Sequence, residues 1–231
     1  IDNTPDQQAN FRAPTLEPSP SNRPQGLDRA PAQRTILLGN GITLKGGLVR
    51  NPSGQLEMGS IRSGMVALDV SVTQPQFDYT AVREFSDIIL RDRALLSASG
   101  IPGGSIALVG NNLYLSSASI IINNNFGNSA SGNITITLSG NMVLSGLSNP
   151  NNFLRNGIIF TPLLGTQTFA LGKGGDVEID VAEDIIIQDF FTINANSFAA
   201  GDSENITINS DNLTLIGQPP LPGQQLTSTI S

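Results

Sequence analysis

The sequence predicts an all-β fold, a single-stranded parallel β-helix, and the main reason is an internal repeat. Each repeat begins with a glycine or polar turn, continues into a short strand with apolar residues at alternate positions, turns at a polar corner and enters a second short strand. The pattern occupies four stretches: Gly103–Leu115, Gly132–Leu144, Gly174–Ile187 and Glu204–Leu215. Their first strands begin at equivalent positions: Ile106, Ile134, Val177 and Ile206. Repeats of this length indicate a solenoid, in which each repeat buries its apolar face by stacking on its neighbours.

The composition of the chain is the second reason for this prediction. The 231 residues include 24 glycines and 10 phenylalanines but no tryptophan, and 39% of them are hydrophobic. Such a chain builds a thin aliphatic core and uses much of its length in turns. No segment has helical periodicity, and the short apolar groups have the length of strands.

Charge and residue types exclude several functions. The net charge is −7, whereas a nucleic-acid partner requires clustered Lys and Arg. The chain has no cysteine and no histidine, which excludes disulfides and thiolate metal sites and removes the commonest general base. No apolar run approaches the roughly 18 residues of a transmembrane helix. We therefore expect no nucleic-acid partner, no transmembrane segment and no cofactor.

The chain divides into three parts. Residues 1–33 are predicted to form an extended Pro-rich arm or linker, because proline disfavours both helix and central strand. Residues 34–217 are predicted to form the β-helix, with roughly seven or eight coils that each add about 4.8 Å. Residues 218–231 are a Pro/Gly-rich tail, which we expect to lead into further sequence of a longer protein.

Two stretches depart from the repeat and are interpreted as excursions, near residues 74–83 and 148–171. Insertions in a solenoid often carry its binding face. The second excursion concentrates aromatic residues, and we expect a contact loop there formed by Phe153, Arg155, Phe160 and Phe169. The alternative is that both excursions cover an open face of the solenoid.

Carboxylates near the C-terminus are the candidates for metal binding or catalysis. They are Asp176, Glu178, Asp180, Glu183, Asp184 and Asp189. Several oxygen ligands of this kind suit calcium, but the first three alternate with aliphatic residues and should face solvent. The pair Asp180 and Asp184 has the residue types for glycoside hydrolysis, but catalytic carboxylates lie in clefts. We predict neither a metal site nor a catalytic residue.

Other motifs carry little weight. Gly39–Lys45 and Gly172–Asp176 are glycine-rich, but a phosphate loop leads into a helix and no helix is expected after either. Three glycosylation sequons begin at Asn133, Asn205 and Asn212. Each of these asparagines opens a strand of the repeat, so the sequons follow from the repeat itself.

Two stretches carry a resemblance to a known family. Leu37–Ile61 (LLGNGITLKGGLVRNPSGQLEMGSI) and Phe85–Gly127 resemble a segment of cyanobacterial filamentous-haemagglutinin-like exoproteins, and Asn22–Leu27 fits the lead-in to that segment. The resemblance covers about residues 22–145. It implies a right-handed parallel β-helix that is exported by two-partner secretion and is extracellular or on the cell surface. The family's transporter-recognition motifs are not found here, so an outer-membrane transporter would contact a region outside this chain.

The repeat and the resemblance together predict a non-enzymatic adhesive and structural β-solenoid, whose partners are cell-surface glycans or other cells. Two alternatives belong to other classes. One is a structural fibre or surface-layer unit that self-associates without a receptor, and the other is a polysaccharide-cleaving β-helix enzyme.

Overall fold

The computed structural model describes residues 26–69, 76–146, 154–155, 158–159, 162–202, 204–217 and 229–230. These residues form β-strands, turns and bends, and they contain no helix. Most of the predicted N-terminal arm (residues 1–25) and most of the C-terminal tail lie outside the described residues.

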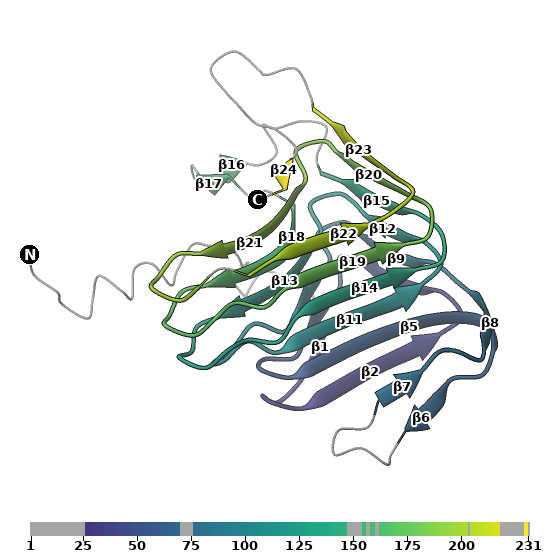
Figure 1. Ribbon diagram of the computed structural model, residues 1–231, viewed down its shortest axis with the longest axis horizontal. Coiled ribbons are helices and arrows are strands. Elements are labelled where there is room, and N and C mark those ends of the chain that lie inside the picture. Colours follow the sequence, from purple (N-terminus) through teal and green to yellow (C-terminus); the bar gives the residue numbers. More distant parts are fainter. Residues whose placement is uncertain are drawn as a thin grey trace, which may run out of the picture.

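Three parallel sheets make up the body of the molecule (Figure 1). Sheet A contains β1 (Leu27–Asp28), β4 (Leu48–Arg50), β10 (Leu95–Ser97), β13 (Ile120–Asn125), β18 (Leu163–Thr168), β21 (Thr192–Ser197) and β24 (Thr229–Ile230). Sheet B contains β2 (Arg34–Gly39), β5 (Gln55–Gly64), β11 (Ser105–Gly110), β14 (Ile134–Leu138), β19 (Val177–Val181) and β22 (Ile206–Asn209). Sheet C contains β3 (Ile42–Lys45), β9 (Ile88–Arg91), β12 (Leu113–Leu115), β15 (Met142–Ser145), β20 (Asp184–Gln188) and β23 (Asn212–Ile216).

The chain passes through sheets B, C and A in turn and then repeats the circuit one strand further along, which makes the molecule a solenoid. The pairing register confirms the predicted repeat, because Ile106 pairs with Ile134, Ile134 with Val177 and Val177 with Ile206. Within the described residues, sheets B and C each stack six parallel strands and sheet A stacks seven, where seven or eight coils were expected. Each coil needs three strands, and two of the coils contain long additional segments.

The core is the space enclosed by the three sheets. Inward side chains of successive coils stack in aliphatic columns, and one continuous cluster joins buried residues from Val49 to Ala195. Sheet A is also apolar on its outer side, where Leu95, Ile120, Ile122 and Leu163 form a second buried cluster. All six residues of β13 and all six of β18 are buried, so these strands are covered on both faces.

Polar residues link the coils at the corner between sheets B and C. Successive strands of sheet C are preceded by Asp87, Asn112 and Asn141, and the next two begin with Asp184 and Asn212. Their side chains form a ladder: an Asp87 carboxylate oxygen accepts from the Asn112 amide, and the Asn141 side-chain oxygen accepts from the Asp184 backbone at 3.1 Å. Each rung satisfies polar groups that the turn would otherwise leave unpaired.

The corner between sheets C and A has a different repeated geometry. Pairs of consecutive non-glycine residues adopt positive φ there: Asp92 with Arg93, Ser117 with Ala118, and Asp189 with Phe190. The left-handed region is unfavourable for residues with a Cβ. The corner nevertheless recurs in three coils, and backbone hydrogen bonds such as Arg93 N–H to the Ser117 carbonyl, at 2.9 Å, link one such corner to the next.

The first excursion is larger than the predicted stretch at 74–83. β5 runs on past sheet B, and β8 (Val82–Phe85) pairs with this extension in antiparallel fashion. Between them, β6 (Ala67–Asp69) and β7 (Gln76–Asp78) form an antiparallel hairpin. In Figure 1 this hairpin lies beside β2 and β5, at the opposite end of the stack from β22 and β23.

The second excursion is shorter than the predicted stretch at 148–171. β16 (Leu154–Arg155) and β17 (Ile158–Ile159) form a small antiparallel pair outside the three sheets. However, β18 lies within the stack, paired with β13 and β21. The strand is not recognisable by alternation because it is buried on both faces, so its sequence LLGTQT resembles a loop.

Candidate functional site

The outer face of sheet B is divided into two halves by the first excursion. Outward positions follow one another from coil to coil, so one row runs through Gly59, Val109, Thr137, Asp180 and Asn209. The half formed by β2 and β5 packs against the excursion, whereas the half formed by β14, β19 and β22 faces outward.

On the covered half, a small network joins the sheet to the excursion. The Tyr79 hydroxyl donates to Glu57 Oε1 at 2.8 Å, and Arg34 forms an ion pair with Glu57 Oε2 at 3.0 Å. The Arg34 guanidinium also lies over the Phe77 ring, 5.3 Å from its centroid. Gly59 lets the Tyr79 ring pack closely against the sheet, because a Cβ at this position would lie only 2.7 Å from the Tyr79 oxygen.

This environment raises the pKa of the Tyr79 hydroxyl above its ordinary value of 10.0. Burial is the main cause, since it penalises the phenolate, and the hydrogen bond and negative charge of Glu57 act in the same direction. The positive charge of Arg34 acts in the opposite direction. The neutral hydroxyl is therefore a structural donor that fastens the excursion to the sheet.

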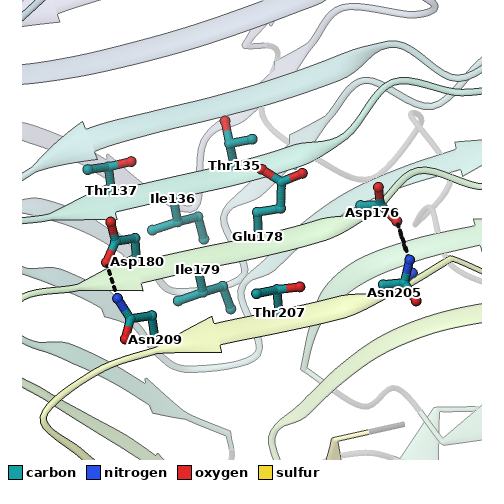
Figure 2. Close-up of a pocket in the computed structure, with 10 residues that line it drawn as sticks. All are labelled: Thr135, Ile136, Thr137, Asp176, Glu178, Ile179, Asp180, Asn205, Thr207 and Asn209. Carbon is teal, nitrogen blue, oxygen red and sulfur yellow. Dashed lines mark hydrogen bonds between the residues drawn. The ribbon is translucent and has the colours of Figure 1, made fainter.

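On the open half, polar side chains line a shallow hollow of about 510 Å³ (Figure 2). Its polar lining consists of Thr135, Thr137, Asp176, Glu178, Asp180, Asn205, Thr207 and Asn209. The strict alternation of β19, which is buried at Val177, Ile179 and Val181 and exposed between them, places its carboxylates on this face. This confirms the sequence-based expectation that Asp176, Glu178 and Asp180 form an outward row.

The three carboxylates of the hollow are oriented by amides of neighbouring coils. One Asp180 oxygen accepts from the Asn209 amide at 3.1 Å, and one Glu178 oxygen accepts from the Asn133 amide at 3.0 Å. Asp176 accepts from the Asn205 backbone at 2.9 Å. Each of these hydrogen bonds uses only one oxygen of its carboxylate, so the second oxygen can accept from a ligand.

Threonine hydroxyls supply donors between these acceptors. In Figure 2, Glu178 lies between Thr135 and Thr207, and Asp180 lies between Thr137 and Asn209. Among the described residues, none of these three hydroxyls has a hydrogen-bond partner. The hollow therefore combines donors and acceptors, carries three negative charges and has no Lys or Arg in its lining.

A second hollow, of about 410 Å³, lies at the end of the covered half and has a different character. Arg62, Arg83, Glu84, Phe85, Asn111 and Ser139 line it. Its two arginines suit an anionic ligand, in contrast to the acidic hollow on the same sheet.

The remaining candidate carboxylates are spread over different parts of the solenoid. Asp184 belongs to sheet C, and one of its oxygens accepts from the Asn212 amide at 2.6 Å, so it does not share a cleft with Asp180. Glu183 binds the Asn141 amide, and Asp189 accepts from the Ser145 hydroxyl. In the part of the chain that the structure describes, no group of three or more acidic side chains could hold a metal ion.

Of the four predicted contact residues, the structure describes the side chain of Phe169 alone. Phe169 follows β18 and stacks between Phe126 and Phe198, with ring centroids 5.4 and 5.1 Å apart, in a ladder along the stack. Arg155 lies on β16, and Phe153 and Phe160 lie outside the described residues. The ladder repeats at the intervals of the coils, which is a signal that comparison of the repeats could have found.

The glycine-rich stretches and the sequons have structural roles. The backbone amides of Gly172 and Gly174 donate to the Gly127 and Asp202 carbonyls at 3.1 and 3.3 Å, so they are not available to cradle a phosphate. Gly39–Lys45 comprises the last residue of β2, a two-residue turn and the whole of β3, and the next element is a strand, β4. Asn133 and Asn205 belong to the coil-to-coil hydrogen bonds of the hollow.

Comparisons of the chain with models of protein families, with curated proteins and with solved structures gave no match. A search of the described residues for a helix long and apolar enough to cross a membrane also found none.

Proposed function

We propose that the chain is a non-enzymatic, adhesive and structural segment of a secreted or cell-surface exoprotein, of the filamentous-haemagglutinin-like class that its sequence resembles. In this proposal the solenoid is a right-handed parallel β-helix that projects from the cell as a rod. An outer-membrane two-partner-secretion transporter would export it, through a region outside this chain. Its targets are cell-surface glycans or other cells.

The observation that supports an adhesive role is the open half of sheet B. A solenoid that served only as a spacer would need a hydrophilic outer face. Charged side chains without fixed orientations would be sufficient for that purpose. Here the carboxylates Glu178 and Asp180 are instead fixed by amides of neighbouring coils. Orienting polar side chains in this way is what a recognition surface requires.

Retention of the purified chain on immobilised polysaccharides and on bacterial cells tests this function. We expect retention that does not depend on the second excursion. The matched variant replaces residues 146–162 with Ser117-Ala118-Ser119, the short corner that joins sheets C and A in another coil. Loss of retention with this variant would mean that the binding site lies on the excursion. If neither protein is retained, the adhesive role is contradicted.

A second candidate function, a fibre that grows by end-to-end association, is supported by the C-terminal coil. Leu213, Leu215 and Ile216 of β23 are 42%, 45% and 43% exposed. β22 and β23 are also edge strands of their sheets, and exposed apolar edges promote strand pairing between molecules. Light scattering that rises in mass with protein concentration, and is abolished by Leu215→Lys, would favour the fibre.

A further inference from the structure

We propose that the hollow on β14, β19 and β22 binds an uncharged polysaccharide chain that runs along the stacking axis, across the strands. This inference rests on the proposed adhesive function and names its ligand class and its site. The hollow spans three coils, and its lining combines hydroxyl, amide and carboxylate groups with the nearly buried Ile136 and Ile179.

The arrangement of the groups favours a polymer of repeated units. Successive strands of a sheet are about 4.8 Å apart, so a chain lying along the axis meets a new pair of polar side chains at regular steps. These pairs are Thr135 with Thr137, Glu178 with Asp180, and Thr207 with Asn209. A ligand that lay along one strand would meet a single pair and would leave the others unused.

The hydrogen-bonding chemistry favours sugar hydroxyls. A hydroxyl both donates and accepts, and the hollow offers carboxylate oxygens that only accept beside threonine hydroxyls that do both. A hydrogen bond to a charged group is stronger than one between neutral groups. Because Asn133 and Asn209 already hold Glu178 and Asp180 in place, little side-chain entropy is lost on binding.

The charge of the hollow decides between classes of polysaccharide. Asp176, Glu178 and Asp180 repel uronic acids and sulfated sugars, and the lining has no basic residue to compensate for them. Lys173, the nearest basic residue in sequence, forms an ion pair with Glu204 at 3.4 Å. An acidic polysaccharide would instead be attracted to Arg62 and Arg83 in the other hollow.

Calorimetric titration of the whole chain with cello-, manno- and chito-oligosaccharides, and with oligouronates, tests the inference. We expect at least one uncharged series to bind, with affinity that rises with oligomer length until three coils are covered. The variant Glu178→Gln/Asp180→Asn keeps the amide hydrogen bonds but removes the charges, and we expect it to weaken binding about tenfold or more. Thr135→Val/Thr137→Val should also weaken binding, because it removes two hydroxyls.

Control variants separate the outcomes. Asp211→Asn removes one negative charge outside the hollow, and Arg62→Ala/Arg83→Ala alters the basic hollow, so neither should affect binding of uncharged oligosaccharides. If the wild-type chain is retained on cells or polysaccharides but the hollow variants are retained equally, the inference is wrong and the adhesive function stands. If only oligouronates bind, the ligand class is wrong. If the wild-type chain is retained on nothing, the proposed function itself fails.

Discussion

The covered and open halves of sheet B have the same inner side and opposite outer sides. On the inner side, Met58 of the covered half and Ile179 of the open half belong to one continuous column and are both buried. On the outer side, the Glu57 carboxylate accepts a hydrogen bond from Tyr79 and forms an ion pair with Arg34. Glu178 lies in the same row, but among the described residues its carboxylate accepts only from the Asn133 amide. Equivalent carboxylates thus hold the excursion against the sheet in the covered half and remain available for a ligand in the open half.

The difference between the halves indicates that the outward residues of a solenoid can change without a change in its core. Stacking needs only the inward residues and the ladder hydrogen bonds of the backbone. Outward residues are then free to differ from coil to coil, and an excursion decides which of them are covered.

The largest effects are expected where the two halves are alike. Replacing Met58 or Ile179 with Ala removes most of a buried side chain from the same column, and each change should lower the free energy of unfolding by about 2–5 kcal/mol. Urea denaturation of both variants measures this. A loss confined to Met58→Ala would mean that the open half has no packed core of its own, which would contradict the comparison.

Substitution of Gly59 should have an effect that is specific to the covered half. The neighbouring position in the same row is Val109, so valine is compatible with the strand. At Gly59, however, the added side chain would meet Tyr79 and Leu38, and we expect Gly59→Val to destabilise the protein by about 1–3 kcal/mol and to displace the excursion. Denaturation gives the stability, and faster proteolysis near residues 65–80 reports the displacement. Unchanged values for both would show that the excursion does not depend on this contact.

The sequence predicts those parts of the structure in which apolar and polar residues alternate along a strand. The register of Ile106, Ile134, Val177 and Ile206, and the outward direction of Glu178 and Asp180, follow from alternating apolar residues. β18 could not be predicted in this way, because burial on both faces removes the alternation. The contacts of Tyr79 with Glu57 join residues 22 positions apart through an irregular excursion, and no local pattern reports such a pairing.

A smaller and pH-dependent effect should be specific to the covered half. The pKa of Tyr79 is raised in the folded protein, so above the ordinary value of 10.0 the unfolded chain loses the proton while the folded chain keeps it. Stability from this group is therefore complete below about pH 10 and falls as the pH rises further. Denaturation midpoints between about pH 8 and 11 should decline less steeply in Tyr79→Phe than in the wild type.

The chain contains only two tyrosines, which provides a matched control for this prediction. Tyr114 lies on sheet C and is 36% exposed. We expect Tyr114→Phe to keep the wild-type dependence on pH. Equal slopes for Tyr79→Phe and the wild type would mean that folding does not raise the pKa of Tyr79.

The smallest effect on stability is expected on the open half. Thr137 occupies the same row as Gly59, yet its hydroxyl has no hydrogen-bond partner among the described residues, and valine suits a strand as well as threonine does. We expect Thr135→Val and Thr137→Val each to change the free energy of unfolding by no more than about 0.5 kcal/mol. Thermal and urea denaturation measure this, and a loss of about 1 kcal/mol or more would show that these hydroxyls stabilise the fold. If stability is unchanged while oligosaccharide binding weakens, the open half contributes to recognition without contributing to cohesion, which is the reverse of the role of Tyr79 and Glu57.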